Sequence, residues 1–174
     1  LCDRRQRQMC IRDRCYWYSA KKSEEFITMR ILYAASEARP FAASGGLADV
    51  AGSLPKALCA AGEEACVVMP YYVNSFKPEQ KEKMNYITNF TVPVGWRSQY
   101  CGLFSQQVDG VTYFFIDNEF YFKRDNGLYG YYDDAERYVF FSRAVLEMLK
   151  YIQFKPQVIN SNDWQCALLS LIHI

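Results

Sequence analysis

The chain has 174 residues, of which 51% are hydrophobic and 22% are charged, and its formal net charge is +1. This length fits one domain with a substantial core, and a near-neutral charge provides no basic face for nucleic acid or anionic lipid. No apolar run approaches the ~18 residues that a membrane-spanning helix needs. We therefore expect neither a nucleic-acid nor a membrane partner.

The first 28 residues differ in composition from the rest of the chain. They contain seven of the twenty basic and four of the nineteen acidic side chains, so the remainder has a formal charge of −2. They lack the apolar core of a secretory signal, and MCIRDR at residues 9–14 resembles a translated sequencing adapter, as LIHI at residues 171–174 does. We expect residues 1–28 to be a non-native leader and native sequence to run over residues 29–169. Residues 170–174, with the only histidine, His173, would be a non-native tail.

The cysteines outside the leader are isolated in apolar or helical surroundings and show no CxxC spacing. This pattern is typical of reduced thiols and indicates a cytoplasmic protein. The residues concerned are Cys59, Cys66, Cys101 and Cys166.

From Met29 onward, predicted strands and helices alternate. Residues 30–36 form a short apolar run typical of a buried strand, and residues 47–61 have helical spacing, with apolar side chains at positions 47, 50, 51, 54, 57 and 58. Pro55 predicts a kink or a break in this helix at Leu54, and Gly62 is a typical residue for its end. Residues 64–70 predict a second strand.

The second half of the chain continues this alternation. Residues 71–84 predict a surface loop or a short helix, and residues 85–94 and 99–118, with a turn at 108–111, predict a β-hairpin insert. Residues 133–150 are the clearest helix, with apolar side chains at 135, 139, 140, 144, 145, 148 and 149. Residues 157–163 predict another strand, and a helix begins at Trp164. The sequence thus predicts an α/β domain, a Rossmann-like, doubly wound and mostly parallel sheet.

Two polar loops are expected at one edge of this sheet, residues 36–46 and 160–165, where the strands end and ligands bind. Gly45 and Gly46 precede a helix, whose N-terminal N–H groups and dipole suit a phosphate. The same glycines are also explained by the conformation of a tight strand-to-helix turn. The pattern is neither GxGxxG nor a P-loop, so ordinary nucleotide-binding motifs are absent.

Three carboxylates belong to these loops. Glu37 and Asp49 flank the glycines, and Asp49 falls in the first helical turn, where a capping role is an alternative to ligand binding. Asp163 is either the N-cap of the following helix or a ligand of sugar hydroxyls. The adjacent Trp164 is either a core anchor or a face on which a sugar packs.

Three stretches resemble the glycogen synthase and starch synthase family, glycosyltransferase family 5. They are MRILYAASEARPFAASGGLADVAGSLPKAL at 29–58, LYGYYDDAERYVFFSRAVLE at 128–147 and PQVINSNDWQCALL at 156–169. The resemblance implies a GT-B fold, in which this chain would be a partial N-terminal domain facing a second Rossmann-like domain. It also implies that glucose is transferred with retention from ADP-glucose to the non-reducing end of an α-1,4-glucan, without a cofactor or a metal.

The resemblance implies the site residues as well. The glycine loop matches the segment that approaches the donor diphosphate, and residues 162–164 match a His-Asp-Trp segment, with Asn162 in place of the histidine. Ala43 replaces the family's lysine, so a positive partner for phosphate is missing. The expected catalytic residues are Asp163 and Asp49, and the expected substrate-binding residues are Ser44, Gly45, Gly46, Glu37, Tyr129, Trp164 and Asn162.

Two other functions compete with this interpretation. The donor's basic partners lie in the family's C-terminal domain, so we expect the chain alone to be inactive, and a non-catalytic or degenerate glucan-binding module of the same fold is the alternative. An NAD-dependent oxidoreductase is disfavoured, because residues 64–73 offer neither GxGxxG nor an acidic residue closing the strand. The residues do not distinguish ADP-glucose from UDP-glucose.

Overall fold

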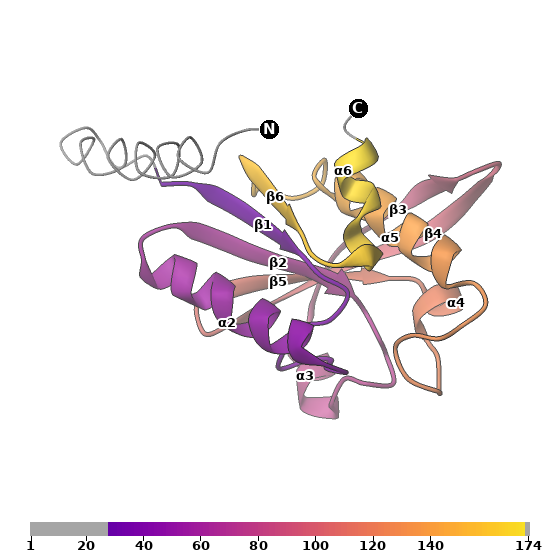
Figure 1. Ribbon diagram of the computed structural model, residues 1–174, viewed down its shortest axis with the longest axis horizontal. Coiled ribbons are helices and arrows are strands. Elements are labelled where there is room, and N and C mark those ends of the chain that lie inside the picture. The colour runs from indigo at the N-terminus through magenta and orange to yellow at the C-terminus, as the bar shows by residue number, and fades with distance from the viewer. Residues whose placement is uncertain (1–27, 173–174) are drawn as a thin grey trace, which may run out of the picture.

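The structure is a computed structural model that describes residues 28–172 (Figure 1). All but one residue of the expected leader, and His173 and Ile174 of the expected tail, lie outside the described residues. The expected boundaries at residues 28 and 169 therefore stay predictions.

A six-stranded sheet forms the centre of the domain. Its strands are β1 (Arg30–Ala34), β2 (Glu64–Pro70), β3 (Asn85–Val94), β4 (Arg97–Val108), β5 (Val111–Asp117) and β6 (Val158–Ser161). The helices are α2 (Gly46–Ala60), α3 (Pro78–Glu82), α4 (Glu119–Phe122), α5 (Asp134–Met148) and α6 (Leu168–Ile172), with a 3-10 turn, η1 (Trp164–Cys166).

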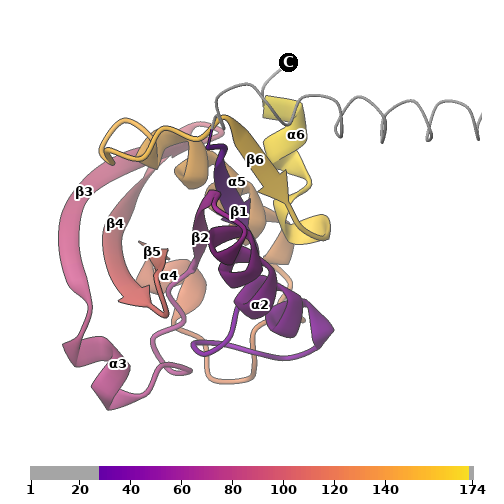
Figure 2. The ribbon, with the colours of Figure 1, turned by 90° about the vertical axis from the view of Figure 1, so that its left-hand side faces the viewer.

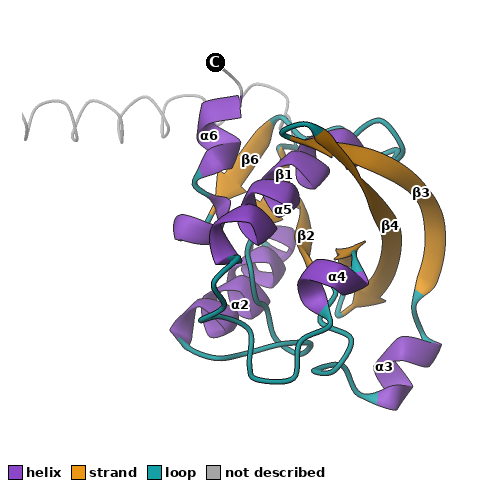
Figure 3. Cartoon of the chain, turned by 90° about the vertical axis from the view of Figure 1, so that its right-hand side faces the viewer, coloured by secondary structure: helices purple, strands orange, loops and turns teal. Residues whose placement is uncertain are grey.

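The strand order is β3-β4-β5-β2-β1-β6. Strands β5, β2, β1 and β6 are parallel, and β3 and β4 join them as an antiparallel meander, which confirms the predicted α/β fold. The expected β-hairpin insert was wrong in one respect, because β5 pairs in parallel with β2 and is an integral strand of the sheet. The long strands β3 and β4 bend strongly at one side of the domain, as the two opposite views in Figure 2 and Figure 3 show.

Consecutive side chains of the central strands are buried, so both faces of the sheet are covered. The buried runs are Leu32–Ala34, Ala65–Pro70 and Tyr113–Ile116. Helix α2 packs on β2 and β5, and α5 packs on β3 and β5. Phe41, from the loop after β1, packs edge-on against Phe115 with ring centroids 4.7 Å apart, which ties that loop to the core.

Helix α2 buries a different face from the predicted one. Its buried residues are Ala48, Ala51, Gly52 and Pro55, whereas Val50 and Leu54 are exposed. The reason is close packing, because a Cβ on Gly52 would lie 2.9 Å from the carbonyl oxygen of Arg39. The helix also continues through Pro55, whose ring is buried, so of the predicted kink or break the break is wrong.

Helix α5 differs from its prediction at two positions. Ala135 is exposed although it was expected on the apolar face, and Arg137 is fully buried. A buried arginine requires partners for its charge and its N–H groups, and the loop before α5 supplies them.

Asp117, at the end of β5, generates a prediction on stability. Burial, followed by the nearby negative Glu119, raises the pKa of Asp117 from 3.8 to about 6. A raised folded-state pKa means that the folded state binds the proton more tightly than the unfolded state. The stabilisation that comes from protonated Asp117 is therefore fully present below pH 3.8 and is lost as pH rises through about 6. We expect Asp117→Asn to increase the free energy of unfolding in urea by about 1 kcal/mol at about pH 8, with little effect at about pH 4.

Glu119→Gln is the matched control, because it removes the second cause of the raised pKa and leaves Asp117 in place. It should weaken the pH dependence without abolishing it. An effect of Asp117→Asn that is equal at both pH values would contradict the assignment.

Candidate functional site

The loops that follow β1 and β6 begin side by side. Ala34 and Ser161, the last residues of these parallel strands, are partners in the register, which confirms that the two polar loops lie at one edge of the sheet. Asn162 joins them further, because its backbone N–H and its side-chain Nδ2 both donate to the Ala34 carbonyl, at 3.1 and 3.0 Å. The side-chain nitrogen of Asn162 is therefore occupied by a hydrogen bond within the fold.

The glycines at the start of α2 have no local structural requirement. Gly45, the N-cap, is extended (φ −159°, ψ −164°), and neither glycine is in the left-handed region. A Cβ on Gly46 would meet no atom within 4 Å, and one on Gly45 would lie 3.9 Å from Glu37 Oε1. No side chain forms a cap hydrogen bond at Gly45. The backbone conformation therefore does not require glycine at either position, and the backbone at Gly46 faces open space.

The buried side chain of Glu37 binds the backbone of the glycine loop. The residue is 2% exposed, and its Oε2 accepts the backbone N–H of Ser44 at 2.5 Å. A carboxylate is favourable here because the N-terminus of α2 carries partial positive charge. Glu37 thus fixes the conformation of the loop in which Ser44, Gly45 and Gly46 lie.

Tyr129 reaches the same loops from the segment before α5. Its hydroxyl lies 2.7 Å from the Ser36 hydroxyl, just after β1. Burial raises the pKa of Tyr129 to about 12, the Ser36 and Ser44 hydroxyls lower it, and the negative Glu37 and Asp163 raise it. The phenol is therefore neutral at physiological pH and can donate or accept a hydrogen bond.

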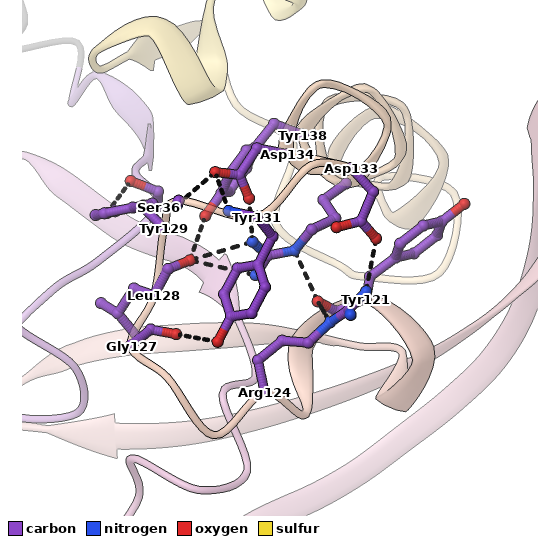
Figure 4. A network of polar contacts seen from close by, with 12 residues as sticks. Ser36, Tyr121, Arg124, Gly127, Leu128, Tyr129, Tyr131, Asp133, Asp134 and Tyr138 are labelled. Carbon is purple, nitrogen blue, oxygen red and sulfur yellow. Dashed lines mark hydrogen bonds and ion pairs between the residues drawn. The ribbon is translucent and has the colours of Figure 1, made fainter.

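The loop that carries Tyr129, residues 123–133, is held by buried polar contacts (Figure 4). Arg137 Nε donates to the Tyr121 carbonyl at 2.8 Å, and its two terminal nitrogens donate to the Leu128 carbonyl at 3.3 and 3.2 Å. Arg137 also pairs with the Asp134 carboxylate, and the Tyr138 hydroxyl donates to the same Leu128 carbonyl at 3.2 Å. The backbone next to Tyr129 is thus fixed from α5.

Further contacts close the two ends of this loop. Arg124 and Asp133 form an ion pair of 2.6 Å, and both side chains are largely buried. At the tip, the Tyr131 hydroxyl accepts the Asn126 N–H at 2.9 Å and donates to the Gly127 carbonyl at 3.2 Å. The loop is therefore closed by contacts between its own residues.

Asp163 has an unusual backbone conformation. Its φ of 63° and ψ of 177° fall in a region that is nearly exclusive to glycine and costs about 1–3 kcal/mol. Its carboxylate accepts the Trp164 N–H at 2.7 Å as the N-cap of η1, so the capping role is present, and the side chain is exposed. Such strain is typical of functional sites.

Trp164 lies between the core and the surface. Its indole packs edge-on against Tyr138 at 5.1 Å and lies 6.4 Å from the Tyr129 ring, and about half of the residue is exposed, at 51%. A fixed ring with a free face is suited to the C–H surface of a sugar. The structure therefore brings Glu37, the glycine loop, Tyr129, Asp163 and Trp164 to one edge.

Among the described residues, Asp49 pairs with Arg39 and not with a member of this group. It is in the first turn of α2, but its exposed carboxylate pairs with Arg39 and makes no cap hydrogen bond. Within residues 28–172, no hydrogen bond or ion pair joins Asp49 to Tyr129 or Asp163. Its expected role at the site stays a prediction.

Several residues of this site were not singled out from the sequence. Ser36 was included only in the loop range, and Arg137 and Asp134 were not identified, although their i,i+3 spacing was visible. Such a pair of charges on a helix is normally solvated, and only the three-dimensional packing shows that this one is buried.

The described residues offer few other reactive groups. Their four cysteines are free thiols, and burial raises the pKa values of Cys66 and Cys166 to about 12. Within residues 28–172, no three His, Cys, Asp or Glu side chains come together as metal ligands. In the same range, no helix combines the length and apolar character of a membrane span.

Comparison with known proteins gives a consistent result. The family described as starch synthase catalytic domain matches residues 30–173. A glycogen synthase of Clostridium botulinum (strain Eklund 17B / Type B) is 52% identical over 144 residues, 83% of this chain and 30% of that protein. The glycogen synthase of Geobacillus stearothermophilus is 54% identical over 144 residues, 83% of this chain and 29% of that protein.

A solved structure shares the fold. The catalytic domain of starch synthase IV from Arabidopsis thaliana, bound to ADP and acarbose, has a TM-score of 0.75 and 27% identity, covering 84% of this chain and 30% of that one. The chain spans about 30% of the length of the curated relatives that it matches. It therefore belongs to the starch synthase catalytic domain family and corresponds to an N-terminal portion of that domain.

Proposed function

We propose that this chain is the N-terminal part of a glycogen (starch) synthase, a retaining cytoplasmic glucosyltransferase that transfers glucose from ADP-glucose to the non-reducing end of an α-1,4-glucan. The observation that carries the proposal is the open glycine backbone at the N-terminus of α2, beside the half-exposed Trp164 and the strained Asp163. The names of the relatives support the reaction, and the ADP and acarbose bound to the Arabidopsis domain support a nucleotide and a glucan as ligands.

The glycine loop would stabilise the leaving diphosphate. Charge builds on that group as the bond to glucose breaks, and the first N–H groups of α2 have no intrahelical partners. Because no side chain caps Gly45, these donors and the positive end of the helix dipole remain available. Ser44 lies in the same loop, which Glu37 holds in place.

The other side of the site would hold the sugar and the glucan. Trp164 offers a ring face, and the Tyr129 hydroxyl and the Asp163 carboxylate can bind sugar hydroxyls. Asn162 would act by joining the loops after β1 and β6, and we assign Asp49 to the cleft wall beside Arg39. Asp163 and Asp49 remain the proposed catalytic carboxylates.

A non-catalytic glucan-binding module of the same fold is the second candidate. The observation in its favour is Ala43, which places no cation beside the glycine loop where the family's motif has a lysine. It predicts glucan binding without transfer, so an activity measurement separates the two candidates.

A chimeric enzyme tests the proposal directly. Residues 30–169 of this chain would replace the corresponding segment of the Geobacillus stearothermophilus glycogen synthase, which is 54% identical to it. We expect the chimera to incorporate radiolabelled glucose from ADP-glucose into glycogen and the chain alone to incorporate none, because its cleft lacks a second wall. A folded but inactive chimera that still binds glucan would favour the binding module. Transfer by the chain alone would contradict the two-domain site.

Gly46→Ala in the chimera tests the phosphate interpretation. A methyl group meets nothing in the fold, so we expect the free energy of unfolding to stay constant or rise by up to about 1 kcal/mol. The methyl would, however, keep the backbone from a diphosphate, and losing charge-assisted hydrogen bonds should raise KM for ADP-glucose on the order of tenfold.

Gly52→Ala is the matched control on the same helix. Its methyl would clash with the Arg39 carbonyl, so it should destabilise the fold by about 1–3 kcal/mol and leave KM unchanged in the protein that remains folded. If Gly46→Ala instead lowers stability and leaves KM unchanged, the glycines serve the turn alone.

Asp163→Asn separates catalysis from capping. Asparagine accepts the Trp164 N–H equally well and has nearly the same shape as aspartate, so the backbone strain is unchanged and the melting temperature should hardly change. If the charge acts in the reaction, kcat should fall by at least about tenfold. Asp109→Asn, at another aspartate with positive φ (50°), is the control and should leave kcat unchanged. Full activity of Asp163→Asn would reduce Asp163 to an N-cap.

A further inference from the structure

The most deeply buried charge among the described residues is the guanidinium of Arg137, whose residue exposure is 0%. It lies among three aromatic rings, with its central carbon 4.9 Å from the Tyr131 centroid, 5.4 Å from Tyr138 and 5.8 Å from Phe122. Removing such a charge from water costs several kcal/mol unless its N–H groups and its charge are matched. The groups that the guanidinium contacts therefore indicate its structural role.

These contacts converge on one backbone carbonyl. The Leu128 oxygen accepts three hydrogen bonds, two from the terminal nitrogens of Arg137 and one from the Tyr138 hydroxyl. A carbonyl oxygen has two lone pairs, so its capacity as an acceptor is fully used. Asp134, which pairs with Arg137, also accepts the Gly130 N–H at 2.7 Å. The backbone is thus fixed on both sides of Tyr129.

The Tyr129 hydroxyl lies 2.7 Å from the hydroxyl of Ser36, which is 93 residues away in the chain, and the Ser44 hydroxyl of the same loop also lowers the pKa of Tyr129. The Ser36–Tyr129 hydrogen bond joins the loop before α5 to the loop after β1, and it requires the Tyr129 backbone to be held within reach of Ser36. Figure 4 shows Leu128, Tyr129 and Ser36 within one network of polar contacts.

From this geometry we infer that Arg137 is a positioning residue for Tyr129: it holds the Leu128 carbonyl so that the Tyr129 hydroxyl is fixed against Ser36 at the edge of the site. The inference rests on the proposed function only in so far as Tyr129 contacts substrate. A core that served stability alone would not need the charge, because apolar residues of similar volume commonly replace a buried ion pair without loss of stability. The guanidinium instead fixes the directions of its hydrogen bonds, because its N–H donors lie in one plane.

The test uses the full 174-residue chain with 3-fluorotyrosine at position 129 and records its fluorine NMR resonance. Ser36→Ala defines the resonance of Tyr129 without its hydrogen bond to Ser36. Arg137→Lys keeps the charge and loses the planar fork, so we expect its resonance to move toward the Ser36→Ala position or to broaden. Arg143→Lys is the matched control on the same helix, because Arg143 pairs only with Glu147 at 3.5 Å and is partly exposed.

A second pair of variants keeps the test decisive if Arg137→Lys does not fold. Tyr138→Phe removes one donor from the Leu128 carbonyl, and Asp134→Asn removes the charge that pairs with Arg137. Both should move the Tyr129 resonance in the direction of Ser36→Ala. An unchanged resonance in the folded variants, or an equal change with Arg143→Lys, would overturn the inference.

The kinetic arm separates this inference from the proposed function. In the chimera, Tyr129→Phe and Arg137→Lys should each lower kcat/KM roughly threefold to tenfold, and the double variant should lose no more than either single one. Additive losses would contradict positioning. If the unmodified chimera has no activity, the proposed function fails, and the fluorine resonances still decide whether Arg137 positions Tyr129.

Discussion

The parallel pairing of β1 with β6 is the constraint on which the rest of the site depends. Because Ala34 and Ser161 are partners in the register, the chain leaves the sheet twice at the same point, once toward the glycines of α2 and once toward Asp163 and Trp164. Neither loop is near the other in sequence. The site therefore exists only when the central strand β1 is in place, with β2 on its other side.

Two kinds of rigidity meet at this edge. The segment before α5 is fixed by charge, with Arg137 and Arg124 matched to Asp134 and Asp133. The glycine loop is fixed by one buried carboxylate, Glu37, and otherwise presents bare backbone. Preorganised donors of this kind lose little freedom when a ligand binds, which is the condition under which backbone dipoles stabilise developing charge most effectively.

The sequence predicted what local patterns determine. The alternation of apolar runs and helical spacing identified the parallel sheet, and the polar segments at 36–46 and 160–165 were placed correctly at one edge. What it missed depends on contacts between distant residues. Val50 and Leu54 suggested the wrong face of α2, because the contact of Gly52 with Arg39 decides the orientation of that helix. β5 was assigned to an insert because nothing within it indicates that β2 is its neighbour.

The separation of these contacts along the chain has a consequence for folding. Arg137 binds carbonyls only nine and sixteen residues away, so the segment from Tyr121 to Arg137 can close with a small loss of chain entropy. The Ser36–Tyr129 bond spans 93 residues, and contacts of such long range form slowly. The tyrosine would thus be oriented within its own segment early, and the final docking of two preformed loops would complete the site.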